Sequence, residues 1–117
     1  MGCNGGEKAF EVSLERSGGG CVVVFRGDLD LNAADELWHG IELAATEGPV
    51  VLDLTDTTFM DSTGVKLLLR AYMAHGAGAE AVTLRAPSDP VVQTLAVAGI
   101  HDIFRIEERD TLPIAGA

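Results

Sequence analysis

The segment VVLDLTDTTFMDSTGVKLLLRAY, residues 50–72, decides the fold class, because it joins a strand pattern directly to a helix pattern. Residues 50–54 are a β-branched and apolar run, which is typical of a central strand. Residues 56–61 are interpreted as a loop. A helix is expected to begin near Asp61 or Ser62, with these residues on its buried face: Val65, Leu68, Leu69 and Tyr72.

Two strand patterns and a helix pattern precede this segment. Residues 10–14 alternate apolar and polar side chains, and residues 21–25 form a continuous apolar run beyond a Gly-rich turn. The pair predicts an antiparallel hairpin. Asn32 is the expected N-cap of the helix that follows, because acidic residues stand in the turn after it. The apolar stripe of that helix comprises Leu37, Ile41, Ala44 and Ala45, and Gly48-Pro49 ends it.

Three further elements are expected after the segment. Val82 and Leu84 mark a fourth strand, a short helix runs from Ser88 to Gly99, and residues 104–106 form a fifth strand. The order β-β-α-β-α-β-α-β predicts a single α/β domain with a mostly parallel sheet, whose antiparallel edge is the N-terminal hairpin. The domain is expected over 9–109, between a disordered tail, 1–8, and a short C-terminal tail, 110–117.

Composition excludes several classes of function. Eight Lys and Arg against eighteen Asp and Glu give a net charge of −10 over 117 residues, so a nucleic-acid footprint is absent and anionic membranes are disfavoured. The sequence contains no apolar run of membrane-spanning length and no signal-peptide pattern, so a cytoplasmic location is expected. Cys3 and Cys21 lack zinc spacing and predict neither a metal site nor a disulfide framework.

No motif of an enzyme or of a cofactor-binding protein is found in the chain. It has no phosphate-binding glycine loop before a helix and no nucleophile elbow, so neither a cofactor nor catalysis is expected. His39, His75 and His101 are interpreted as structural or solvent-facing. Asp53 is either a phosphate acceptor or a polar residue at a strand end.

Residues 59–65, FMDSTGV, place hydroxyl groups at the start of the expected helix. In one interpretation Asp61 or Ser62 simply caps the helix. In the other, Ser62 accepts a phosphate, which the helix dipole favours by about 0.3–1 kcal/mol. Added charge there would oppose a docked protein, because two unit charges about 5 Å apart interact by about 3 kcal/mol at an effective dielectric near 20.

At these residues the sequence resembles the STAS domain of bacterial anti-sigma-factor antagonists. The family pattern is an apolar pair followed by Asp-Ser-Ser/Thr-Gly-Leu, and residues 59–65 match it. Gly27-Asp28-Leu29-Asp30 corresponds to a second family element, Gly-Glu-Leu-Asp, with Asp28 in place of Glu. Gly99-Ile100 and residues 103–106 correspond to a third. The resemblance covers about residues 8–108.

The resemblance implies a binding protein and not an enzyme. Such proteins bind an anti-sigma factor, often also a serine kinase, and so regulate transcription by a sigma factor. The kinase would phosphorylate Ser62 and release the complex, and a serine phosphatase would reset it. Asp30 corresponds to the family's acidic residue near that serine and either shapes the partner surface or only caps a turn. The implied partner-binding residues are Asp30, Asp61, Ser62, Thr63, Gly64 and Lys66.

Lys66 stands where many family members have glycine. Lys66 and Arg70 follow Ser62 by four and eight residues and share its helix face. They form a solvated cationic face, or Lys66 pairs with a phosphate on Ser62 or contacts the partner. The C-terminal tail lacks the fuller helix of many members, so the oligomeric state stays open.

Three other functions are considered for the chain. A STAS accessory subunit of a lipid-transport or stress-signalling complex would have the same fold and no kinase regulation. A response-regulator receiver would be phosphorylated at Asp53, but a receiver has no second strand before its first helix. A weak nucleotide-hydrolysing enzyme would need a general base or metal cluster that the sequence does not show.

Overall fold

A computed structural model describes residues 10–17, 20–75 and 82–107. The elements follow the expected order, with one short 3₁₀ helix before the last strand. They are β1 (Phe10–Ser17), β2 (Gly20–Leu29), α1 (Leu31–Ala45), β3 (Val50–Met60), α2 (Ser62–His75), β4 (Val82–Arg85), α3 (Asp89–Ala98), η1 (His101–Ile103) and β5 (Arg105–Glu107).

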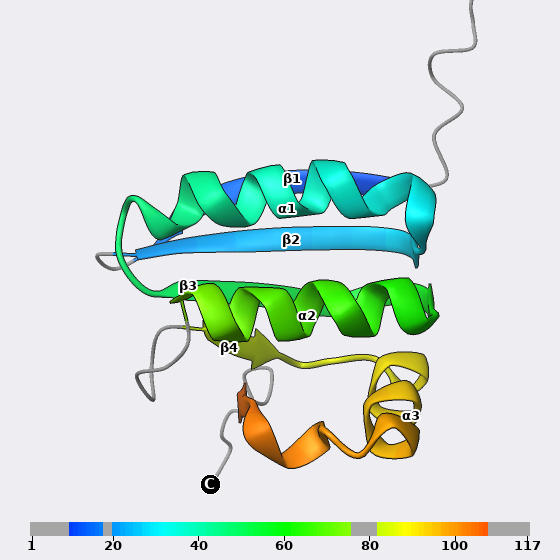
Figure 1. Cartoon of the computed structure of the whole chain (residues 1–117). Helices are drawn as coiled ribbons and strands as arrows, with labels where there is room; N and C mark the ends of the chain where they lie inside the picture. The colour runs from blue at the N-terminus through cyan, green and yellow to red at the C-terminus, as the bar shows by residue number, and fades with distance from the viewer. Residues whose placement is uncertain (1–9, 18–19, 76–81, 108–117) are drawn as a thin grey trace, which may run out of the picture.

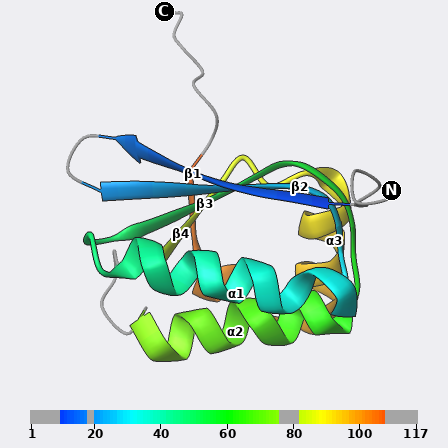
Figure 2. The ribbon, with the colours of Figure 1, turned by 90° about the horizontal axis from the view of Figure 1, so that it is seen from above.

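The five strands form one sheet in the order β1-β2-β3-β4-β5 (Figure 1). β1 and β2 are antiparallel, and every other neighbouring pair is parallel. The predicted mixed sheet with an N-terminal hairpin edge is therefore confirmed. α1 and α2 lie side by side over one face of this sheet (Figure 2), as right-handed crossovers between consecutive parallel strands require.

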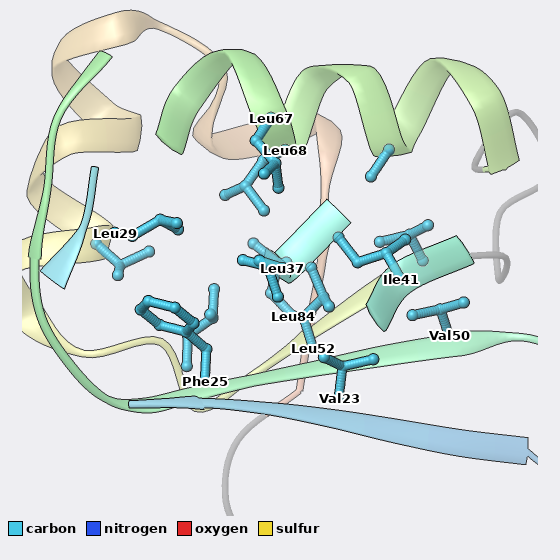
Figure 3. Close-up of a cluster of buried hydrophobic side chains, with 14 of the residues drawn as sticks. Val23, Phe25, Leu29, Leu37, Ile41, Val50, Leu52, Leu67, Leu68 and Leu84 are labelled. Atoms are coloured by element: carbon cyan, nitrogen blue, oxygen red, sulfur yellow. The ribbon is translucent and has the colours of Figure 1, made fainter. Parts of the chain in front are cut away.

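The hydrophobic core lies between the sheet and these two helices (Figure 3). Phe25 and Leu52 from the strands, Leu37 and Ile41 from α1, and Leu68 from α2 have no solvent exposure. Leu37, Ile41 and Ala44 of the predicted α1 stripe are buried, whereas Ala45 is half-buried. Burying such side chains contributes about 1.5–3 kcal/mol each, so this layer fixes how α1 and α2 lie on the sheet.

The predicted loop at residues 56–61 is wrong, because β3 continues to Met60. The extension pairs with the end of β2, where Asp28 lies opposite Phe59 and Leu29 opposite Met60. Buried Leu29 and Met60 hold these two strand ends against the core. The long β3 brings the start of α2 directly beside the start of α1.

Two details of the predicted helices also need correction. Asp30, not Asn32, is the N-cap of α1, because its carboxylate accepts a hydrogen bond from the Asn32 N–H. The buried residues of α2 are Gly64, Leu67, Leu68 and Ala71. Of the predicted set only Leu68 is fully buried; Val65, Leu69 and Tyr72 are half-buried. Residues 67–69 are three consecutive leucines, so the sequence is compatible with two apolar helix faces that differ by about one residue. Packing against α1 and the sheet determines which of the two faces is buried.

α3 begins and ends as expected. Ser88 is its N-cap residue, and Gly99 ends it at a positive φ of 77°, which glycine adopts without strain. The predicted tails, 1–8 and 110–117, lie outside the described residues. Within the described parts of the chain, no helix is long and apolar enough to cross a membrane.

Candidate functional site

Two strand-to-helix junctions lie side by side at one edge of the sheet. β2 and β3 run parallel, so α1 and α2 both begin beyond the carboxyl ends of their strands. The backbone N–H of Asp61 donates to the carbonyl of Leu29 at 3.4 Å and ties one junction to the other. The segments 29–31 and 60–62 are therefore neighbours although about thirty residues separate them in the chain.

Asp61 is the N-cap of α2. Its Oδ1 accepts hydrogen bonds from the N–H groups of Thr63 at 2.9 Å and Gly64 at 3.4 Å. The capping interpretation of the sequence is thus confirmed for Asp61 and does not apply to Ser62, which is the first helical residue. Asp61 therefore caps the helix, and Ser62 is not needed for that role.

Ser62 is exposed, and its hydroxyl has no hydrogen-bond partner among the residues that the structure describes. Thr63, the adjacent hydroxyl residue, is half-buried. A modifying enzyme can therefore reach the Ser62 Oγ without breaking an internal contact of the fold. Chemically, this is an exposed alcohol at the first position of α2.

Gly64 allows α2 to start close to the strand ends. It is buried, and a Cβ placed on it would collide with the side chain of Met60 and approach Leu29 Cγ to 3.0 Å. A side chain at this position would push the first turn of α2 outward. Gly64 therefore determines the position of Ser62, and Gly64 itself is buried and does not reach the protein surface.

Asp30 performs at α1 the task that Asp61 performs at α2. Its Oδ1 accepts from the N–H of Asn32 at 3.0 Å, so the cap role left open by the sequence is shown. Asp28, two residues earlier in the chain, accepts from Thr58 Oγ1 at 2.7 Å and joins the ends of β2 and β3. Both carboxylates are half-buried.

The charges around Ser62 are divided between acidic junctions and a basic helix face. Asp28, Asp30 and Asp61 supply carboxylates at the junctions. Lys66 and Arg70 on α2 are both exposed, as predicted. The Arg70 guanidinium lies 4.0 Å from the centroid of the Trp38 ring, whereas Lys66 has no ion pair within the described residues.

Exposed apolar side chains flank the two junctions, and sequence reasoning did not identify them as functional. Leu31, the first residue of α1, is 77% exposed, and Phe59, next to the end of β3, is 47% exposed. Large apolar side chains left in solvent beside a polar centre are typical of a protein–protein contact. We call Asp30, Leu31, Phe59, Ser62 and Lys66 together the edge surface.

α3 and its N-cap residue are hydrogen-bonded to the end of β3 that carries part of the edge surface. Thr94 Oγ1 donates to the carbonyl of Met60 at 3.1 Å, and Ser88 Oγ donates to the carbonyl of Thr57 at 2.6 Å. These bonds fix the end of β3, on which Phe59 and the start of α2 depend. Sequence patterns located the helix but could not show this attachment.

Metal ligation and phosphorylation of Asp53 were the other site chemistries considered, and the described residues bear on both. The described residues contain no group of three or more His, Cys, Asp or Glu side chains able to hold a metal ion. Asp53 lies within β3, and its carboxylate accepts from the N–H of Thr55 at 3.0 Å. The Asp53 carboxylate therefore makes a hydrogen bond within β3 and lies away from the edge surface.

Comparison with known proteins gives consistent relatives. Residues 12–108 match the family described as "Mlab, STAS domain". An anti-sigma-B factor antagonist of Listeria monocytogenes is 26% identical over 83 residues, which cover 69% of this chain and 73% of that protein.

Solved structures share the fold. An anti-sigma factor antagonist from Mycobacterium paratuberculosis superposes with a TM-score of 0.72 at 24% identity, covering 84% of this chain and 85% of the other. The anti-sigma factor antagonist SpoIIAA in its unphosphorylated form gives 0.69 at 24% identity, covering 86% and 90%. The phosphorylated form of SpoIIAA, from Bacillus, gives 0.62 at 24% identity, covering 86% and 93%.

Proposed function

Because the chain belongs to the STAS domain family, we propose that it is an anti-sigma-factor antagonist whose grip on an anti-sigma factor is released by phosphorylation of Ser62. A relative of that name in Listeria monocytogenes and the existence of SpoIIAA in a phosphorylated form support this function. The antagonist would regulate sigma-factor-dependent transcription by binding, and would catalyse no reaction itself. Its expected site of action is the cytoplasm.

One observation carries the proposal: the exposed Ser62 hydroxyl is free while Asp61 caps the helix beside it. A serine kinase can modify Ser62 without removing the cap, so the fold persists in both states. A serine phosphatase can reach the same atom to reverse the change. The switch therefore acts on the surface and not on folding.

The edge surface is the proposed contact with the anti-sigma factor. Leu31 and Phe59 supply apolar area that a partner would bury, and Asp30 supplies a carboxylate beside it. Asp61, Thr63 and Gly64 belong to the same site because they set the position of Ser62. Lys66 lies one helical turn farther along α2, at the margin of this contact.

Phosphorylation would break this contact by electrostatics and desolvation. A phosphoserine carries a charge of about −1.5 to −2 and three strongly hydrated oxygens. Against a partner packed on the edge surface, the repulsion estimated above suffices for a loss of about 100-fold in affinity. This repulsion requires an acidic group of the partner facing Ser62, and the cost of desolvating the phosphate oxygens acts in the same direction.

The direct test is phosphorylation by the candidate kinase. Purified kinase partner and ATP are expected to add one phosphate, located by mass spectrometry at Ser62, and Ser62→Ala abolishes it. Thr63→Ala is the matched control because it removes the adjacent, half-buried hydroxyl. Phosphate that persists in the Ser62→Ala protein would refute the assignment. Copurification with transporter components and no modification would instead favour the accessory-subunit function.

A further inference from the structure

We propose that Lys66 is the intramolecular partner of the phosphate on Ser62, so that modification closes an ion pair along the first turns of α2. The inference rests on the proposed phosphorylation of Ser62 and adds a regulatory element to it. In the unmodified protein Lys66 has no ion pair with any residue of 10–17, 20–75 or 82–107, and in the phosphorylated protein its ammonium turns toward the serine. The residue thus distinguishes the two states of the switch.

The spacing of the two residues suits such a pair. Ser62 is the first residue of α2 and Lys66 follows four residues later, so both side chains lie on one face, about 6 Å apart along the axis. An anionic residue four positions before a lysine is the favourable orientation in a helix. Both residues are exposed, so neither must leave a packed position to meet the other.

Two of the usual ligands of a phosphate at a helix start are already engaged here. A phosphate near the first turn would accept hydrogen bonds from free backbone N–H groups. At α2 the N–H groups of Thr63 and Gly64 both donate to the Asp61 carboxylate, at 2.9 and 3.4 Å. These two donors are not available to the phosphate, and a cationic side chain on α2 is the remaining source of a full counter-charge.

The neighbouring side chains supply mostly negative charge. Asp61 directly precedes the serine, and Asp28 and Asp30 belong to the adjacent junction. On α2 the cations are Lys66 and Arg70. Arg70 is about 12 Å from Ser62 along the helix axis and lies over the ring of Trp38. Lys66 is therefore the cation best placed to neutralise the phosphate.

Neutralisation by Lys66 changes the phosphate itself. A nearby ammonium stabilises the dianion, so the phosphate of the wild-type protein loses its second proton at a lower pH than it would without Lys66. It also limits repulsion from the carboxylates of the junctions, which lets the released form remain folded. Neither effect requires an anti-sigma factor to be present.

The test uses full-length protein with phosphoserine incorporated at position 62 during translation, followed by phosphorus NMR across the pH range of the second phosphate ionisation. In Lys66→Gln the midpoint of that titration is expected to rise by about 0.3 pH unit, the size of an exposed ion pair one turn apart. Lys66→Arg should restore the wild-type midpoint. Arg70→Gln, which removes an equal charge one turn farther away, should shift it by less than half as much.

Two outcomes would overturn the proposal. One is an identical midpoint in wild type and Lys66→Gln; the other is an equal shift in Arg70→Gln, which would mean that only net charge matters. Circular dichroism of each variant verifies that α2 is intact. Because the phosphate is installed without a kinase, a negative result here does not bear on whether Ser62 is modified in signalling, and failure of the kinase test does not bear on this ion pair.

Discussion

The junctions β2–α1 and β3–α2 share one construction and differ at the first three helical positions. Each parallel strand ends in an aspartate that caps the next helix through the N–H group two residues on, at 3.0 Å for Asp30 and 2.9 Å for Asp61. The first helical residue is Leu31 in α1 and Ser62 in α2. The third is Ala33 in one and Gly64 in the other, both buried.

This difference separates structural from functional residues. The two capping aspartates make equivalent hydrogen bonds, so their role is structural: each starts a helix after a parallel strand. The first helical position faces solvent in both junctions, and there one chain segment presents an apolar anchor while the other presents a free hydroxyl. In the proposed function Leu31 would bind the partner and Ser62 would carry the switch, and each can be changed separately.

The largest stability effect is expected at the third helical position. Gly64→Ala places a Cβ against Met60 and Leu29, and the overpacking should lower the free energy of unfolding by about 1–3 kcal/mol despite the better helix propensity of alanine. The reciprocal change, Ala33→Gly in α1, should cost about 1 kcal/mol through propensity. Urea unfolding followed by circular dichroism measures both. A Gly64→Ala protein as stable as wild type would show that the two junctions are interchangeable.

A binding effect of intermediate size is expected at Leu31. Leu31→Ser should weaken binding of the anti-sigma factor about tenfold, because it removes apolar area at the centre of the contact. Its stability should stay within about 0.5 kcal/mol of wild type, since the side chain is exposed. Leu43→Ser is the control, because Leu43 is also exposed but lies toward the other end of α1. Calorimetric titration measures both affinities. An equal loss of affinity in the two variants would mean that the edge surface is not the contact with the partner.

The smallest effect concerns the caps, where the junctions should behave alike. Asp61→Ala is expected to cost about 1 kcal/mol of stability, and Asp30→Ala slightly less because it accepts one backbone N–H rather than two. Asp61→Asn retains an acceptor oxygen and should keep most of the stability. Thermal unfolding compares the set. Asp61→Asn as unstable as Asp61→Ala would mean that charge, and not capping geometry, holds the start of α2.

Sequence reasoning reached those parts of the fold that local patterns encode. The hairpin, the order of strands and helices, the cap of α2 and the exposed cations of α2 follow from periodicity and capping rules. It failed where pairing across the sheet decides the structure. Thr57 and Thr58 resemble loop residues, yet the partner strand β2 extends β3 to Met60. The exposure of Leu31 and Phe59 likewise depends on tertiary packing, which no local pattern contains.

In the proposed switch, a charge on Ser62 displaces a partner without altering the fold. The most direct measurement compares the dissociation constants of the anti-sigma factor for the unmodified protein and for the protein carrying phosphoserine at position 62. We expect affinity to fall about 100-fold on phosphorylation, with circular dichroism unchanged. Equal affinities for two equally folded forms would contradict the claim.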